Sequence, residues 1–385
     1  MEIRGQIPTL GLADGIVTLS DDVITGVRPA DTTSGDAGDS GEIILPGLID
    51  IHCHGGGGHT FTTTDPGQAR AVTAHHAARG TTRIMASLVT AAADVLLAQV
   101  EALAPLVASG DLLGIHLEGP FLSGARCGAQ SPEFIIDPDP ALAKDLLSAA
   151  NGTIKVVTIA PERPGASALA DLFRSAGVTV ALGHTDADYD TMASGLASLS
   201  GTALVTHLAN GMPPLHHRSA GPAAAALVAA ADDEASVELI ADGVHVDAGF
   251  TRLVFATTAP GRVVLITDAM AAAGMADGSY ELGPMRAEVS GGVARLAPAP
   301  GEAAGSGSIA GGTSSLIEVV ATAHAAGVPL ADAAAAASAA PARALGLPGI
   351  GSITAGAPAD LVLTGPDLRV RRVLRGGEWI ETAAD

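Results

Sequence analysis

Apolar residues recur along the chain in short runs of strand length, each separated from the next by a stretch compatible with a helix. The runs are rich in β-branched residues and are apolar at consecutive positions, a pattern typical of parallel strands buried on both faces. They begin at Ile43, Thr81, Leu112, Ile154, Val178, Ala203, Ser236 and Val263. Eight such units in succession predict an α/β protein with a (β/α)₈ barrel of the TIM type.

The two ends of the chain depart from this rhythm. Residues 1–42 alternate in short segments and finish in a Gly- and Asp-rich stretch from Thr32, which predicts a loop. Residues 350–385 predict two or three antiparallel strands, with turns at Gly365–Pro366 and Gly376–Gly377. Neither end is long enough to bury a sheet face alone, so we expect both to meet in one small β domain beside the barrel. The barrel then spans 43–349, with a β-hairpin excursion around 277–307.

Residues of the types that bind metals follow many of the predicted strands. In a barrel the carboxyl ends of the strands carry the active site, so we expect these side chains to converge. They are His52, His54, Glu118, His184, His207, Asp242, His245 and Asp268. Alone, each has a plainer interpretation as a hydrogen-bonded or capping residue. Together they predict a site for zinc or a similar divalent metal.

Two of these positions have more specific implications. His52 and His54 are two residues apart in a predicted strand, so both imidazoles point to the same side and can bind one ion. Asp268 ends the last strand, where a carboxylate beside an activated water can take its proton and return it to a leaving amine. Neither Lys144 nor Lys155 ends a strand, so a carboxylated lysine cannot bridge two ions, and Glu118 can serve as a bridging or a single ligand instead.

Composition narrows the class of partner and the compartment. The net charge of −21 disfavours nucleic acid and anionic membranes as partners, since both require a basic face. No window reaches about 18 uninterrupted apolar residues, and the first residues do not form a signal peptide. Cys53 and Cys127 are too few for a disulfide framework. We therefore expect a soluble cytoplasmic enzyme.

Several longer motifs resemble those of the N-acetylglucosamine-6-phosphate deacetylase family, within the amidohydrolase superfamily. They are PGLIDIHCHG from Pro46, GIHLEGPFLS from Gly114, VTHLANGMPPLHHRSAGP from Val205, IADGVHVD from Ile240 and LITDAM from Leu265. The similarity covers nearly the whole chain. It implies a barrel with a β-sandwich made by both termini, and a homodimer.

The resemblance also implies roles for individual residues. Glu118, His184 and His207 would be the constant metal ligands, His52 and His54 would hold a second ion, and Asp268 would be the general base and then acid. One or two Zn²⁺ ions per chain would be bound. Arg218 would reach the substrate phosphate, plausibly across the dimer interface. The sugar-phosphate site would be lined by Ala129, Gln130, Asn210, Gly211, His245, Ile309, Ala310 and Gly311.

One position departs from the family pattern. Members usually have a histidine where this chain has Gln130, and glutamine can donate a hydrogen bond but cannot be cationic. The implied reaction is deacetylation of N-acetyl-D-glucosamine 6-phosphate to D-glucosamine 6-phosphate and acetate. The alternatives are another N-acetyl amino-sugar phosphate, a different amidohydrolase substrate such as a cyclic amide, and a catalytically inactive metal-containing binding protein.

Overall fold

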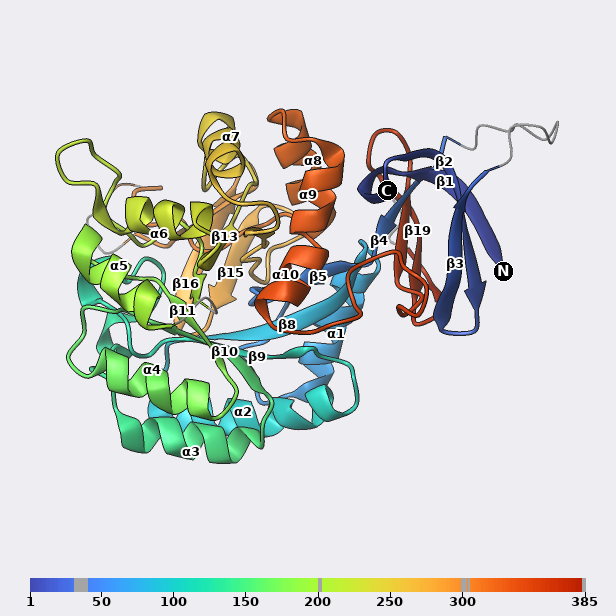
Figure 1. Ribbon diagram of the computed structural model, residues 1–385. Coiled ribbons are helices and arrows are strands. Elements are labelled where there is room, and N and C mark those ends of the chain that lie inside the picture. The colour runs from blue at the N-terminus through green and yellow to red at the C-terminus, as the bar shows by residue number, and fades with distance from the viewer. Residues whose placement is uncertain (31–40, 200–202, 299–302, 304, 383–385) are drawn as a thin grey trace.

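The computed structural model describes residues 1–30, 41–199, 203–298, 303 and 305–382. Its centre is an eight-stranded parallel sheet in the order β14-β13-β12-β11-β10-β9-β8-β5, ringed by helices (Figure 1). The strands are β5 (Leu48–Asp50), β8 (Thr81–Val89), β9 (Gly114–Glu118), β10 (Ile154–Ile159), β11 (Thr179–Leu182), β12 (Ala203–Val205), β13 (Ala235–Leu239) and β14 (Val263–Leu265). The predicted barrel is confirmed.

Helices follow the strands in turn and cover the outside of the barrel. They are α1 (Pro66–Ala77), α2 (Ala93–Ala108), α3 (Pro140–Ala150), α4 (Ala166–Ser175), α5 (Tyr189–Ser198), α6 (Gly221–Ala231), α7 (Ala248–Thr257), α8 (Leu316–Ala325), α9 (Leu330–Ala336) and α10 (Ala339–Ala344). Short 3₁₀ turns lie at η1 (Pro8–Leu10), η2 (Gly124–Arg126) and η3 (Pro132–Phe134). None of the helices in the described residues is long and apolar enough to cross a membrane.

Local sequence explains where several of these helices begin. Asp65, Asp139, Asp188 and Asp247 are the N-cap residues of α1, α3, α5 and α7, and each side chain accepts a hydrogen bond from a backbone N–H of the first turn. These bonds satisfy donors that a helix start otherwise leaves unpaired. In α1 and α3 the cap is followed by proline, whose fixed φ suits the first helical position.

The barrel closes between its first and last strands. The backbone N–H of Asp268 donates to the carbonyl of His52 at 2.9 Å, and that of His54 donates to the carbonyl of Ala269 at 2.7 Å. The interior contains an apolar cluster that includes Ile49, Met85, Val156, Leu204 and Val264, to which α10 adds two alanines. Closure brings the ends of β5 and β14 together, although they are far apart in the sequence.

Both termini form one seven-stranded sheet in the order β20-β19-β18-β4-β1-β2-β3. The strands are β1 (Glu2–Ile7), β2 (Leu12–Ser20), β3 (Val23–Pro29), β4 (Ile43–Pro46), β18 (Leu361–Thr364), β19 (Val370–Arg375) and β20 (Glu378–Ile380). Residues from both halves of the sheet, such as Val17 and Leu363, share one apolar core. The sheet lies beside the barrel with both termini on it, as a β-sandwich (Figure 1). The loop predicted from Thr32 falls largely on 31–40, outside the described residues.

The first predicted barrel strand is divided in the structure. β4 pairs with β18 and β1, so the run from Ile43 supplies one strand to the sandwich and a second, β5, to the barrel. Gly47 lies between the two strands, where a side chain would collide with Thr82. An apolar run alone does not show which sheet receives it, and the expected boundary at residue 43 is therefore displaced.

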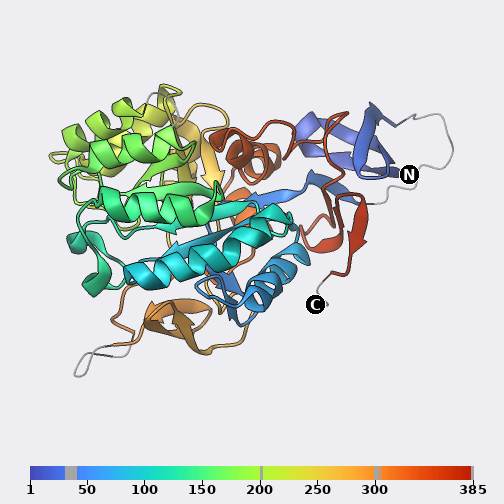
Figure 2. The ribbon, with the colours of Figure 1, turned by 90° about the horizontal axis from the view of Figure 1, so that it is seen from below.

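The excursion after β14 is larger than the predicted hairpin. It is a three-stranded antiparallel sheet of β15 (Gly278–Leu282), β16 (Met285–Ser290) and β17 (Val293–Leu296). Figure 2 shows this sheet (orange) lying against the barrel, apart from the terminal sandwich. A further pair, β6 (Gly55–Gly56) and β7 (His59–Thr60), forms a small ribbon directly after His54.

Candidate metal centre and active site

Three predicted ligands from different strands meet at one point. Glu118 is the last residue of β9, whereas His184 and His207 follow β11 and β12 by two residues. Oε1 of Glu118 lies 3.0 Å from Nε2 of His184 and 3.0 Å from Nε2 of His207, and the two Nε2 atoms lie 3.0 Å apart. Glu118, His184 and His207 form the first ligand cluster, and all are buried.

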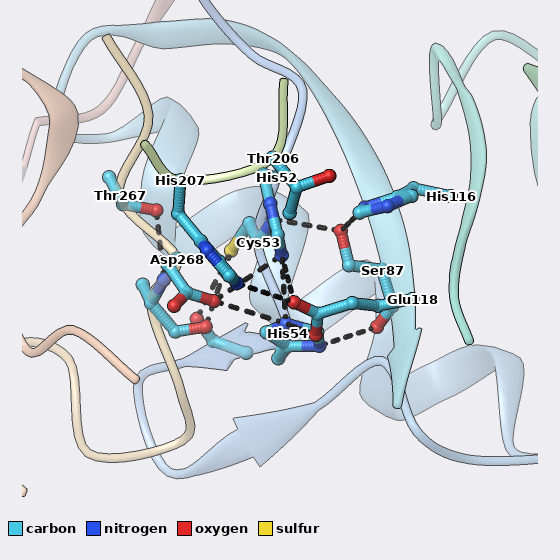
Figure 3. Close-up of polar contacts among 12 residues, drawn as sticks. His52, Cys53, His54, Ser87, His116, Glu118, Thr206, His207, Thr267 and Asp268 are labelled. Atoms are coloured by element: carbon cyan, nitrogen blue, oxygen red, sulfur yellow. Dashed lines mark hydrogen bonds and ion pairs between the residues drawn. The ribbon is translucent and has the colours of Figure 1, made fainter. Parts of the chain in front are cut away.

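A second ligand cluster shares Glu118 and adds His52, His54 and Asp268. Nε2 of His54 lies 3.1 Å from Oε2 of Glu118 and 3.1 Å from Oδ1 of Asp268, and Nε2 of His52 lies 3.2 Å from Nε2 of His54. Figure 3 shows these side chains pointing toward one another. The carboxylate of Glu118 therefore faces both clusters: its Oε1 also lies 3.3 Å from Nε2 of His52, and its Oε2 faces His54.

The hydrogen bonds behind the imidazoles decide which nitrogens face the centre. Nδ1 of His184 contacts the carbonyl of Arg126 at 2.8 Å, Nδ1 of His54 contacts the carbonyl of Ser87 at 3.0 Å, and Nδ1 of His52 contacts Oε2 of Glu238 at 3.0 Å. Each of these oxygens only accepts, so each Nδ1 carries a proton. In a neutral ring Nε2 then presents a lone pair to the centre. Adjacent lone pairs repel unless a cation lies between them, so this arrangement fits a divalent metal.

The pKa values of Asp268 and His54 also fit a site for a metal ion. Burial raises the pKa of the Asp268 carboxyl, but the charge of His52 and a hydrogen bond from His54 outweigh it and lower the pKa to about 2. Burial lowers the pKa of His54, but hydrogen bonds to Asp268 and Glu118 raise it to about 9. The carboxylates thus favour positive charge among the imidazoles, which a metal ion supplies.

Three of the site residues have unusual backbone conformations. His184 (φ 45°), His207 (φ 26°) and Asp268 (φ 48°) lie in the left-handed region, which costs a non-glycine residue of the order of 1–3 kcal/mol. All three follow directly after barrel strands, where the turn directs their side chains inward. Such strain at functional positions is stabilised by the surrounding fold.

A buried polar layer supports the ligands from within the barrel. Ser87 Oγ lies 3.0 Å from Nδ1 of His116, Nε2 of His116 lies 2.9 Å from Thr158 Oγ1, and Thr158 Oγ1 lies 2.8 Å from Thr206 Oγ1. Ser87 Oγ also accepts from the backbone N–H of Cys53 at 3.0 Å, and Cys53 lies between His52 and His54, after the end of β5 (Figure 3). This network connects β8, β9 and β10 with the residues that follow β5 and β12, and limits the movement of the ligands.

A cavity of about 290 Å³ opens above both clusters. Predicted substrate residues on its wall are Ala129, Gln130, Asn210, Gly211, His245, Ile309 and Gly311. Gly128, Leu282 and Ser308 also line it, which the sequence interpretation missed. Leu282 belongs to β15, so the excursion forms part of the wall of the site.

Two predicted substrate residues do not line this cavity. Ala310 is fully buried in the apolar cluster beneath the β15–β17 sheet, and its backbone N–H donates to Ala294. Arg218 is exposed on the loop between β12 and α6. Its backbone N–H donates to Nδ1 of His216 at 3.3 Å. Within one chain, therefore, the structure does not bring Arg218 to the cavity.

Gln130 contacts the metal centre as well as the cavity. Its Oε1 accepts from the backbone N–H of Thr90 at 2.7 Å, which leaves its Nε2 to donate to Oε2 of Glu118 at 2.5 Å. Because a backbone N–H can only donate, the orientation of this amide is determined. Gln130 therefore holds Glu118 in place.

Asp242, predicted with the metal-binding types, joins neither ligand cluster and instead supports His245. Its Oδ2 accepts from Nδ1 of His245 at 2.8 Å. Burial lowers the pKa of His245, but this hydrogen bond and the charge of Asp242 raise it above its usual value. Glu238, which is 0% exposed behind His52, was missed. A glutamate within the otherwise apolar run VELIA was a signal for this residue, because buried carboxylates in such strands need a partner.

The fold and the site define a metal-dependent hydrolase of the barrel type. The chain belongs to the Amidohydrolase family, whose model matches residues 43–380. The resemblance inferred from the motifs is thereby confirmed at the level of the family and of its relatives.

Three relatives show how close the similarity is. An N-acetylglucosamine-6-phosphate deacetylase of Bacillus subtilis is 36% identical over 74% of this chain and 74% of its own length. An N-acetylgalactosamine-6-phosphate deacetylase of Escherichia coli O157:H7 is 34% identical over 97% of this chain and 93% of its own. The structure of a mutant N-acetyl-D-glucosamine-6-phosphate deacetylase of Mycobacterium smegmatis, in complex with N-acetyl-D-glucosamine 6-phosphate, matches with 41% identity and a TM-score of 0.91. It covers 99% of both chains.

Proposed function

We propose that this chain deacetylates N-acetyl-D-glucosamine 6-phosphate, giving D-glucosamine 6-phosphate and acetate. The observation that carries the proposal is the convergence of Glu118, His184 and His207 beside Asp268 at the end of a cavity. The similarity to the mycobacterial deacetylase over 99% of both chains supports the choice of reaction.

We infer that the resident metal is Zn²⁺ and that up to two ions bind per chain. Imidazole and carboxylate donors suit zinc, and each cluster provides at least three of them. Glu118 contacts histidines of both clusters, which supports the proposal that it bridges two ions. When bound, such an ion supplies Lewis acidity, lowering the pKa of a water and polarising a carbonyl.

Asp268 is proposed to move the proton. Its low pKa keeps the carboxylate ionised near neutral pH, and its Oδ1 lies beside His54 at the end of the cavity. Asp268 accepts the proton of the attacking water and then donates it to the amine that leaves when the amide C–N bond breaks. Gln130 keeps Glu118 oriented while this occurs.

The sugar phosphate is proposed to extend from the metal centre toward His245. His245 is held by Asp242 and, with its raised pKa, offers a charge-assisted donor to an anionic group. Arg218 lies outside the cavity of its own chain, so we propose that it reaches the phosphate bound by the second chain of a homodimer. The reducing cytoplasm is the proposed compartment, since Cys53 and Cys127 are unpaired.

A second candidate substrate is N-acetyl-D-galactosamine 6-phosphate, the epimer at C4. The relative named for that substrate aligns over 97% of this chain, more than the Bacillus subtilis relative does.

Acetate release from a panel of N-acetylated sugars tests the proposal, with metal content measured on the same protein. The panel contains both epimers, each with and without the 6-phosphate. We expect the highest kcat/KM for N-acetyl-D-glucosamine 6-phosphate and little turnover without phosphate. A higher kcat/KM for the galactose epimer would support the second candidate, and no release from any member would indicate a different amide substrate or a metal-containing binding protein.

A further inference from the structure

Glu238 is a fully buried carboxylate on β13, inside the barrel. Its Oε2 accepts from Nδ1 of His52 at 3.0 Å and from the backbone N–H of His207 at 3.2 Å. Its other oxygen, Oε1, has no hydrogen-bond partner among the described residues. Glu238 lies outside the cavity wall, so it does not meet substrate directly.

The four histidines of the centre differ in what lies behind them. His54 and His184 are each backed by a neutral backbone carbonyl. Nδ1 of His207 has no partner among the described residues. His52 is the one of the four that has a carboxylate behind its ring. A carboxylate behind a histidine ligand fixes the tautomer and increases the basicity of the nitrogen that binds the metal.

The charge of Glu238 also distinguishes the surroundings of His52 from those of the other three histidines. Glu118 and Asp268 together match the charge of one divalent ion, and Glu238 adds a further buried carboxylate, in contact with the ring of His52. The ion pairs of the described residues give Glu238 a single partner, His52. A buried carboxylate is costly unless a cation lies close by. A second ion held by Nε2 of His52 would lie just across the ring from Glu238.

We propose that Glu238 is a positioning residue for the second ion: it holds His52 in the metal-binding tautomer and strengthens its donor nitrogen, without touching metal or substrate. This inference rests on the proposal that two ions bind per chain. It assigns to the second ligand cluster a supporting carboxylate that the first cluster lacks.

Titration of the metal-free protein with Zn²⁺ and with Co²⁺ tests this inference, using Glu238→Gln. The substitution keeps an oxygen that accepts from His52 and from the backbone of His207, but removes the charge. We expect the first ion to bind as in the unsubstituted protein and the second about 10- to 100-fold more weakly. The visible absorption of Co²⁺ should change in the second step of the titration alone.

Asp50→Asn is the matched control. Asp50 is also fully buried, and it accepts from the backbone N–H of His52 at 3.3 Å but does not contact its ring. We expect this variant to bind both ions as the unsubstituted protein does. Equal weakening of the second ion in both variants would mean that any buried charge suffices, and equal weakening of both ions in Glu238→Gln would mean a structural role. Either result, or unchanged binding, overturns the inference.

The tautomer of His52 can be measured on the unsubstituted protein, so this test does not depend on whether a variant folds. With two Zn²⁺ bound and histidines labelled with ¹⁵N, we expect His52 to carry its proton on Nδ1, with the proton shifted downfield by the carboxylate. A proton on Nε2 would overturn the inference. Binding of a single ion by the unsubstituted protein would overturn the two-ion proposal itself, whereas two ions with an unchanged second affinity in Glu238→Gln would overturn the role of Glu238 alone.

Discussion

At the deep end of the cavity, formed by the two ligand clusters, the side chains lie on barrel strands or shortly after them. At its outer end, the residues proposed to meet the phosphate, His245 and Arg218, lie on loops. His52, Glu118 and His184 are 0%, 2% and 5% exposed, and each has hydrogen-bond partners in the barrel interior or the adjoining loops. Arg218 is exposed, and the structure of one chain does not bring it to the cavity.

This difference suggests that the two ends of the cavity meet different requirements. Groups that stabilise a transition state must be held in place before the substrate arrives, and burial among strands achieves this. Groups that recognise a phosphate tolerate more movement, because a charge acts over a longer distance than an aligned donor. We therefore expect changes at the deep end to lower kcat and changes at the outer end to raise KM.

The largest expected effect is that of Asp268→Asn. Loss of the proton acceptor should lower kcat by about 10²- to 10⁴-fold, while folding and the ion at Glu118, His184 and His207 are retained. Turnover with the N-acetyl sugar phosphate and metal content per chain are the measurements. Near-normal turnover in this variant would remove Asp268 from the mechanism.

Substituting His52 and His54 together by Gln breaks the second ligand cluster while sparing the first. We expect metal content to fall from about two ions per chain to about one, with a large loss of kcat, because two imidazole ligands are lost. Metal analysis and steady-state kinetics on the same samples decide it. Full turnover with one ion would mean that the pair is structural and that the enzyme uses a single metal.

At the outer end, Arg218→Ala should chiefly raise KM. Loss of one charge-assisted contact to phosphate corresponds to about 1.5–3 kcal/mol, or roughly ten- to hundredfold in KM. A substrate without phosphate is the control and should be little affected. Equal damage to both substrates would show that Arg218 supports the loop or the interface between chains, and the oligomeric state in solution would then separate these two roles.

The smallest expected effect concerns pH. The raised pKa of His245 keeps it cationic to higher pH than an ordinary histidine, so KM should be low below that pKa and rise as His245 loses its proton. Asp242→Asn removes the neighbouring charge, so the rise in KM should begin at lower pH. KM measured from acid to mildly alkaline pH in both proteins checks this, and superimposable profiles would contradict it. The phosphate of the substrate titrates equally in both and cancels.

The sequence predicted the residues that meet at the two ligand clusters, and seven of the nine predicted substrate residues line the cavity. The structure does not bring Arg218 to the cavity. All six predicted ligand and catalytic positions, Glu118, His184, His207, His52, His54 and Asp268, meet in the two clusters. Barrel geometry explains this, because any residue directly after a parallel strand must emerge at the same rim. Arg218 lies in a long loop, whose path no strand period specifies.

One strand was predicted wrongly because the apolar pattern of a segment does not show which sheet the segment joins. The run from Ile43 was interpreted as one barrel strand, yet β4 joins the terminal sandwich and β5 begins the barrel. Both segments are buried on both faces, so their apolar patterns are alike. Which sheet receives such a strand depends on pairing with residues far along the chain.

The sequence by itself determined the fold class, the order of the strands and the residues that meet in the two ligand clusters, because periodicity and motif spacing are local properties. The tertiary structure alone decided which groups stand behind those ligands. Glu238 meets the ring of His52 across 186 positions of sequence, and Gln130 meets Glu118 only once its loop folds back over the strand. The left-handed backbone of His184, His207 and Asp268 is likewise stabilised by the assembled barrel. Contacts of this kind form when the barrel closes, and no local pattern encodes them.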